Sequence, residues 1–180
     1  MQRHCFTGAP GAGKTTLLAA LRASGHAVVD EAATDVIAEQ QAAGVDEPWL
    51  SDDFITDVLR LQQRRQDDPP PSGVPLQLFD RSPLCTLALA LFQQRPVPAL
   101  LTQEVDRIVR ERVYEPAVLL VRPLGFVTPS AARRISYADS LRFEAVHEQV
   151  YRDRGFTVVE VLPASVSERV AVVEGVVLRR

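Results

Sequence analysis

The sequence of 180 residues contains no asparagine, a single lysine (Lys14), one tryptophan and two cysteines. It lacks any apolar run near the roughly 20 residues that a membrane-spanning helix requires, and the stretch before its first glycine-rich segment is too short for a signal peptide. Its formal net charge of −3 gives no sign of a basic face for nucleic acid or of an electrostatic membrane anchor. We therefore expect a cytoplasmic protein that binds neither nucleic acid nor membranes.

The two cysteines, Cys5 and Cys85, lie in apolar stretches of the sequence and do not form the spacing of a metal site. Because cytosolic disulfides are rare, we expect both to be reduced core residues. The length suits one compact domain over residues 1–180, and no repeat or low-complexity tract interrupts it.

Predicted strands alternate with predicted helices along the whole chain. Short apolar runs indicate strands over 3–7, 27–29, 76–79, 117–121 and 157–161. Helical spacing and capping signals indicate helices over 14–23, 34–43, 51–67 and 100–114, and helices that begin after Ser82, Ser136 and Ser165. Continuous rather than alternating apolar strands are typical of a parallel sheet covered on both faces.

A glycine-rich segment joins the first predicted strand to the first predicted helix. It matches the pattern G-x-x-x-x-G-K-T of a phosphate-binding P-loop in full. Backbone amides and the helix N-terminus would face the phosphates, the compact ammonium of Lys14 suits a place between the β- and γ-phosphates, and Thr15 would bind Mg²⁺. The residues expected to hold a nucleoside triphosphate are Gly8, Ala9, Pro10, Gly11, Ala12, Gly13, Lys14 and Thr15.

Charged residues follow two other predicted strands. Asp80 closes the third strand, as a Walker B aspartate that holds Mg²⁺ would, and Arg81 beside it suits an anion clamp. Asp30 and Glu31 end the second strand, at the sheet edge that lines the ligand crevice in α/β proteins. A carboxylate there could accept a proton from an attacking hydroxyl or bind a substrate group. The alternatives are a capping role for Asp80 and solvated surface positions for the others.

Residues 123–136 form a predicted loop rich in small residues, and it contains Arg133 and Arg134. Phosphoryl transfer requires positive charge over the γ-phosphate in the transition state, and a closing loop can supply that charge while it excludes water. We therefore predict a lid-like segment with two catalytic arginines. The alternative is a pair of solvated surface arginines.

The remaining candidates are weaker. His4, His26 and His147 have no second ligand at metal spacing, so we expect them to be structural or exposed. Trp49 could stack on a substrate ring, although a core or loop-anchoring role is the more frequent one.

These segments together resemble a known family. The sequence is similar to the AAA-type P-loop domain of the ribosylnicotinamide kinase part of NadR proteins, and to the wider group of nucleoside and nucleotide monophosphate kinases. The segments that carry the resemblance are Phe6-Thr7-Gly8, Lys14-Thr15-Thr16, Val28-Val29-Asp30-Glu31-Ala32-Ala33, Pro48-Trp49 and Phe79-Asp80-Arg81. The resemblance implies a three-layer α/β fold with a five-stranded parallel sheet in the order 2-3-1-4-5.

The resemblance also implies roles for individual residues. Glu31 matches an acidic residue that acts as base or binds the acceptor hydroxyl, and Asp80-Arg81-Ser82 matches an element at the metal and the acceptor. Arg133 and Arg134 resemble lid arginines. The resemblance also adds Thr16 to the residues expected to bind the nucleotide, together with the loop Pro163-Ala164-Ser165, which would contact the adenine.

One position departs from the family pattern. Relatives often carry an arginine three residues after the glutamate, and here that position is Thr34. The acceptor could therefore differ from that of the relatives, or be absent.

Three functions are compatible with these residues. The leading hypothesis is an ATP- and Mg²⁺-dependent kinase that phosphorylates a small nucleoside-like molecule. The alternatives are a regulatory ATPase or nucleotide-dependent switch that acts on a protein partner, and a nucleotide-binding module without catalysis. A homodimer is also compatible with the sequence. A GTPase is excluded because the guanine-reading Asn-Lys-x-Asp motif requires an asparagine, and a hexameric AAA machine would need a longer chain.

Overall fold

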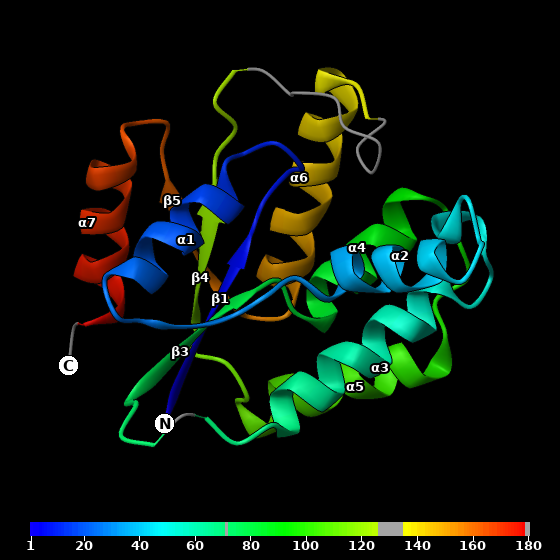
Figure 1. Cartoon of the computed structure of the whole chain (residues 1–180), viewed down its shortest axis with the longest axis horizontal. Coiled ribbons are helices and arrows are strands. Elements are labelled where there is room, and N and C mark those ends of the chain that lie inside the picture. Colours follow the sequence, from blue (N-terminus) through cyan, green and yellow to red (C-terminus); the bar gives the residue numbers. More distant parts are fainter. Residues whose placement is uncertain (71, 126–134, 179–180) are drawn as a thin grey trace.

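The computed structural model describes residues 1–70, 72–125 and 135–178, and it contains one parallel sheet of five strands (Figure 1). The strands are β1 (Gln2–Thr7), β2 (Ala27–Val29), β3 (Leu76–Asp80), β4 (Ala117–Val121) and β5 (Thr157–Val161). Their spatial order is β2-β3-β1-β4-β5 and all four pairings are parallel. The α/β class and the predicted strand order are confirmed.

Seven α-helices and one short 3₁₀ helix (η1) connect these strands within the described residues. They are α1 (Lys14–Ala23), α2 (Ala32–Ala42), η1 (Pro48–Leu50), α3 (Phe54–Asp67), α4 (Pro83–Phe92), α5 (Ala99–Glu111), α6 (Tyr137–Asp153) and α7 (Val166–Val177). All expected helices are present, and the differences lie at their ends.

Three helix boundaries differ from the prediction by two residues or more. The second helix begins at Ala32 rather than at residue 34. The third helix begins at Phe54 rather than at residue 51, because Pro48–Leu50 forms the separate turn η1. The fifth ends at Glu111 rather than at residue 114, because Arg112 adopts a left-handed conformation with φ of 51°. The Val113 amide then donates to the carbonyl of Ile108 at 3.1 Å and closes the helix.

The serine caps behave as the sequence indicates, with one exception. The Ser165 hydroxyl accepts from the Glu168 amide, and the Glu168 carboxylate accepts from the Ser165 amide, so this capping box is complete. The hydroxyls of Ser136 and Ser165 both accept from the amide three residues on and donate to the carboxylate of the same residue. At Ser136, however, the shorter Asp139 accepts no bond from the cap backbone amide in the described structure, so that box is incomplete.

The core consists of two layers on opposite faces of the sheet, and alternate residues of β1 point into each. Cys5 packs with buried residues of α3, α4, α5 and α6, whereas Phe6 packs with α1 and α7. Figure 1 shows α1 and α7 on one side of the strands and the other helices on the opposite side. This is the three-layer arrangement that the resemblance implies.

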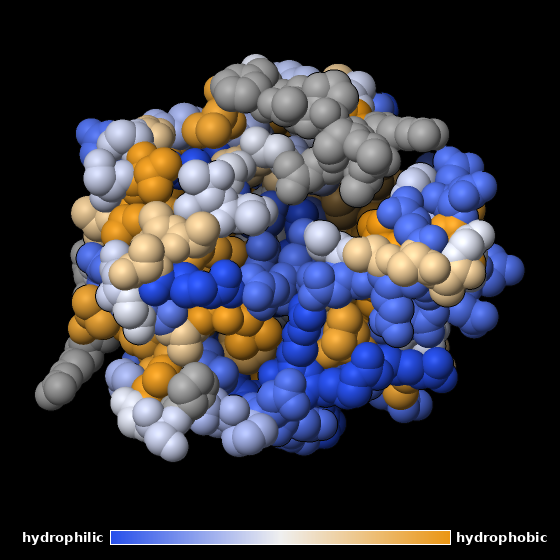
Figure 2. Space-filling model, viewed as in Figure 1, coloured by the Kyte–Doolittle hydropathy of each residue, from blue (hydrophilic) through white to orange (hydrophobic). Residues whose placement is uncertain are grey.

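A smaller apolar cluster joins α2 to α3 beside the carboxyl end of β2. Its buried members are Ala32, Val36, Phe54 and Val58, and the half-buried Trp49 packs against them. In the view of Figure 2 the outer side of α3 is mainly hydrophilic, so this helix buries one face and exposes the other. Among the described residues no helix is long and apolar enough to cross a membrane.

Candidate functional site

The P-loop connects β1 to α1 through glycines in backbone conformations that other residues rarely adopt. Gly8, Gly11 and Gly13 have φ of 131°, 84° and 81°. A Cβ atom on Gly8 would lie 2.5 Å from the carbonyl oxygen of Val121, at the end of the neighbouring β4. Only glycine fits this close approach of two backbones, so the first glycine of the motif is required by the fold itself.

Lys14 is the first residue of α1, and its side chain is buried against the P-loop. Its ammonium donates to the carbonyls of Gly8 at 3.1 Å and Ala9 at 3.0 Å, which uses two of its three donors. Burial, together with the nearby positive charge of Arg81, lowers the pKa of Lys14 to about 8. The ammonium therefore gains from any anion placed in this loop.

A buried arginine supports the same loop from α7. The Arg169 guanidinium donates to the carbonyl of Ala12 at 2.9 Å, and only 3% of Arg169 is exposed. Its Nη1 would lie 3.0 Å from a Cβ on Gly13. Burial lowers the pKa of Arg169. This residue was missed by sequence reasoning, because nothing near position 169 marks it as a neighbour of residue 12.

Asp80 and Arg81 lie next to the P-loop because β3 pairs directly with β1. Phe6 is in register with Asp80, and the Arg81 amide donates to the Phe6 carbonyl at 3.0 Å. Arg81 has a φ of 74°, a strained conformation for a residue with a side chain. Asp80 is buried, its Oδ1 has no hydrogen-bond partner among the described residues, and burial raises its pKa to about 6.

Glu31, which precedes α2, forms an ion pair with Arg81. Its Oε1 lies 2.5 Å from Arg81 Nε, and its Oε2 accepts a hydrogen bond from the Thr34 hydroxyl at 3.1 Å. Burial alone would raise the pKa of Glu31, but Arg81 and Lys14 hold it below its ordinary value. Asp30, in contrast, is exposed and pairs with Arg22 at 2.7 Å. Of the two acidic residues after β2, only Glu31 faces the P-loop side chains.

Thr34 therefore has a defined place in this structure. In the position where relatives often carry an arginine, its hydroxyl fixes one oxygen of Glu31 while Arg81 holds the other. The carboxylate is oriented by one neutral hydrogen-bond donor and one ion pair.

Two cavities meet at the Glu31–Arg81 pair. One, of about 460 Å³, is lined by the P-loop, including Lys14, Thr15 and Thr16. The other, of about 330 Å³, extends away from it between α2, α3, α4 and α6 and is mostly apolar. The residues that line both cavities are Pro10, Glu31, Ala33, Ile37 and Arg81. A cavity of this size accommodates a small molecule.

The apolar cavity has an aromatic wall and few polar groups. The aromatic residues that line it are Trp49, Phe54, Phe92 and Phe143. In addition to Glu31 and Arg81, its polar lining residues are Gln62, Cys85, Thr86 and Gln93. The Gln62 carbonyl accepts a hydrogen bond from Thr86 at 2.8 Å, which fixes that amide within the wall. Trp49 thus both anchors the α2–α3 cluster and faces this cavity.

Other predicted site residues lie apart from these cavities or outside the described residues. Most of the lid-like segment 123–136, including Arg133 and Arg134, lies outside the described residues. Ile135 of this segment is described, and it lines the apolar cavity. Pro163, Ala164 and Ser165 are exposed after β5, and they line neither cavity. The Ser165 hydroxyl is engaged in the cap of α7, so this loop offers mainly backbone groups.

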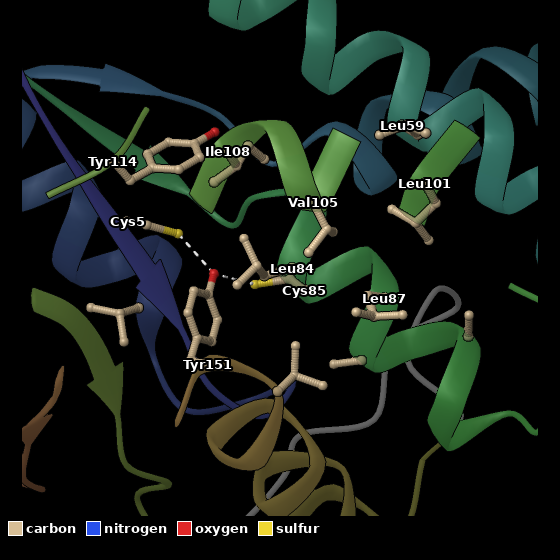
Figure 3. Close-up of a cluster of buried hydrophobic side chains, with 14 of the residues drawn as sticks. Cys5, Leu59, Leu84, Cys85, Leu87, Leu101, Val105, Ile108, Tyr114 and Tyr151 are labelled. Carbon is tan, nitrogen blue, oxygen red and sulfur yellow. Dashed lines mark hydrogen bonds between the residues drawn. The ribbon is translucent and has the colours of Figure 1, made fainter. Parts of the chain in front are cut away.

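Both cysteines are free and buried, as predicted. Their thiols meet the hydroxyl of Tyr151 from α6, at 3.1 Å for Cys5 and 3.3 Å for Cys85 (Figure 3). The same hydroxyl lies 2.7 Å from that of Ser82, the N-cap of α4. The segment after Arg81 is thereby tied to α6.

His147 is the second residue that sequence reasoning missed. It was expected to be structural or exposed, and it is fully buried on α6 with its Nε2 3.2 Å from Nη1 of Arg81. The three histidines are scattered in the sequence, and only the packing of α6 brings this one to the site. No group of three or more potential metal-ligating side chains is found in the described part of the chain, so the histidines form no metal centre there.

Solved structures share this fold at low sequence identity. Deoxyadenosine kinase from M. mycoides with bound dATP aligns with a TM-score of 0.56 and 11% identity, over 99% of this chain and 100% of that one. A NadR protein in complex with NAD and AMP-PNP aligns with a TM-score of 0.67 and 15% identity, over 99% of this chain but 50% of that one. These likenesses establish a P-loop kinase fold.

No curated protein sequence matches the chain. The family described as AAA domain matches residues 3–169, which include the P-loop, Glu31, the Asp80-Arg81 pair, His147 and Arg169. The chain therefore belongs to this AAA domain family.

Proposed function

We propose that this protein is a kinase that transfers the γ-phosphate of ATP to a hydroxyl group of an uncharged, nucleoside-like molecule. The observation that carries the proposal is the meeting of two cavities at the Glu31–Arg81 pair. One cavity has the chemistry of a triphosphate site and the other that of a site for an apolar ring. A protein that only bound or hydrolysed ATP would have no need of the second cavity.

The first cavity suits the phosphates of ATP and Mg²⁺. The cation would be held by the Thr15 hydroxyl, which is exposed in this cavity, and by Asp80, directly or through water. The buried Oδ1 of Asp80 has no partner among the described residues, which fits that role. Mg²⁺ commonly takes only one or two carboxylates besides phosphate oxygens and water, and it would neutralise charge that develops on the phosphates.

The second cavity suits an uncharged acceptor with a planar ring. Among its described lining residues Glu31 and Arg81 are the only charged ones, and they are already paired with each other. A nucleotide monophosphate would bring about two negative charges, which require arginines or other donors that the described residues of this wall do not supply. The aromatic side chains and the amides of Gln62 and Gln93 fit a base-like ring.

The proposal gives these residues roles in a direct transfer. The acceptor oxygen attacks the γ-phosphorus, a new O–P bond forms, and the bond from that phosphorus to the bridging oxygen breaks, so that ADP leaves. Glu31, ionised because Arg81 and Lys14 hold its pKa low, orients the hydroxyl and receives its proton. Lys14 and Arg81 neutralise the charge that spreads over the transferred group. Arg133 and Arg134 of the lid-like segment would add to this charge.

A substrate panel with one matched pair of variants tests the proposal. ATP consumption is measured with nucleosides, vitamins and sugars, and one acceptor should raise it at least tenfold with formation of its phosphate ester. Glu31→Gln should leave ATP affinity within about threefold and reduce ester formation by two orders of magnitude or more. Asp30→Asn, one residue away but exposed, should change neither.

The alternative function gives a different result in the same assay. A regulatory ATPase would hydrolyse ATP slowly with every small molecule and respond only to a protein partner. That outcome, or an equal loss of ATP binding and ester formation in Glu31→Gln, would reject the kinase proposal.

A further inference from the structure

The Arg81 guanidinium contacts two side chains, and the second contact plays no part in the transfer described above. Glu31 contacts its Nε, whereas Nη1 lies 3.2 Å from Nε2 of His147. His147 has no exposed surface, and its ring packs against Phe143 with a centroid separation of 4.3 Å. Phe143 in turn lines the apolar cavity.

The contact is part of one face of α6. Phe143, His147 and Tyr151 recur at intervals of four residues and so lie on the same side of the helix. Phe143 lines the cavity, His147 contacts Arg81, and Tyr151 contacts Ser82. Tyr151 also contacts the two thiols (Figure 3). The helix therefore contacts the segment from residue 81 to residue 82 at two successive turns.

The chemistry of the contact defines the protonation of the ring. A guanidinium has donors and no acceptor, so a hydrogen bond from Nη1 requires Nε2 to be unprotonated. The ring is then neutral, with its proton on Nδ1. An imidazolium would bring a second donor and a second positive charge against Arg81.

Burial and two nearby positive charges favour the neutral form of the ring. The charges are those of Arg81 after β3 and Lys14 of α1, whereas Cys85 of α4 acts in the opposite direction. Burial lowers the pKa of His147, and Arg81 and Lys14 lower it further, whereas the Cys85 thiol raises it. Because the pKa of the folded state lies below the unfolded value of about 6.5, protonation on the acid side weakens both the contact and the fold.

We propose that His147 is a positioning residue for the phosphoryl transfer, a neutral hydrogen-bond acceptor that holds the Arg81 guanidinium in the orientation in which it meets the transferred phosphate. The proposal rests on the proposed function. It explains how Arg81 keeps its strained backbone, with φ of 74°. Glu31 and His147 hold the side chain, and the hydrogen bond from the Arg81 amide to the Phe6 carbonyl holds the backbone. Protonation of the ring at acid pH would remove this contact.

Two variants and a matched control test the positioning role by kinetics. His147→Leu removes the acceptor and should reduce kcat roughly 10- to 100-fold, the effect of losing one hydrogen bond to a charged group, with KM for ATP within threefold. His147→Gln supplies an amide oxygen without a titrating group. It should recover most of kcat, and its kcat should decline less toward acid pH than that of the wild type, because Asp80 titrates in both proteins but the ring only in the wild type.

The control is His26→Leu with His26→Gln, which alters a histidine that pairs with Glu174 far from Arg81. Neither control should change kcat or its pH profile. Thermal unfolding of every variant separates loss of fold from loss of catalysis. A kcat that survives His147→Leu, or an equal loss in His147→Leu and His147→Gln when both are folded, would overturn the proposal.

A second measurement does not depend on catalysis. Long-range ¹H–¹⁵N spectra of the histidine rings, recorded from pH 5 to 8, should show His147 as the Nδ1–H tautomer with a pKa below 6.5. A proton on Nε2 in the neutral protein would refute the acceptor role. If the wild type phosphorylates no acceptor, the proposed function fails, whereas the spectra still decide whether His147 accepts from Arg81.

Discussion

Replacement of Gly8 by alanine tests whether the contact between Gly8 and Val121 is needed both for stability and for ATP binding. The new Cβ would stand 2.5 Å from the Val121 carbonyl oxygen, a backbone atom that cannot rotate away. Two penalties combine: a φ of 131° that alanine rarely adopts, worth roughly 1–2 kcal/mol, and a contact that forces β1 and β4 apart. We expect a total of about 3–4 kcal/mol, which for a chain of this size lowers Tm by roughly 6–16 °C.

A matched variant separates these two penalties. Gly44 follows α2 with a φ of 91°, and a Cβ there would meet nothing within 4 Å. Gly44→Ala should therefore show only the backbone penalty, about 1 kcal/mol or roughly 2–4 °C in Tm, and leave ATP binding unchanged.

Differential scanning calorimetry and titration with ATP measure both effects. Gly8→Ala should bind ATP at least 100-fold more weakly even where it remains folded, because the loop must move to relieve the contact. If the two alanine variants lost the same stability, or if Gly8→Ala bound ATP normally, the reasoning from the Val121 contact would be wrong.

Three further variants address single side chains. Lys14→Ala should abolish ATP binding in calorimetric titration, and retained affinity would contradict the P-loop assignment. The pKa of Asp80 is raised to about 6, so its charged form destabilises the native state above that pH. Asp80→Asn should therefore raise the free energy of unfolding in urea by on the order of 2 kcal/mol at pH 8, and by little near pH 4. The same variant should bind Mg²⁺–ATP poorly. A variant no more stable than wild type at pH 8 would show that Asp80 is not penalised by burial. Thr34→Val removes the donor to Glu31 and should raise the acceptor KM by less than tenfold with ATP affinity intact; an unchanged KM would mean that Arg81 alone orients Glu31.

The parts of the site that the sequence predicts are those encoded over short distances. The P-loop is a local pattern, and Asp80-Arg81 follows a strand whose parallel pairing with β1 places it beside that loop. The strand order came from the family resemblance and is confirmed. The preference for Glu31 over Asp30 came from the same resemblance, and the role of Glu31 stays a prediction. The end of α5 escaped prediction because Arg112, not glycine, adopts the left-handed conformation there.

The parts that the sequence does not predict depend on packing between distant segments. His147 meets Arg81 across 66 residues, and Arg169 meets Ala12 across 157. Neither belongs to a motif, since any buried helix face can carry a histidine or an arginine. The departure at Thr34 was visible in the sequence, but that its hydroxyl fixes Glu31 follows only from the geometry of the first turn of α2.

The contact between Arg169 and Ala12 has a consequence for the order of folding. The carbonyl of Ala12 obtains this donor only when α7, the last helix along the chain, has docked beside α1. A contact of such long sequence separation forms late, because the intervening chain must first be ordered. During synthesis the segment from β1 to α6 can leave the ribosome with its phosphate loop still unsupported. We expect such a nascent chain to bind ATP more tightly once α7 has emerged and docked beside α1.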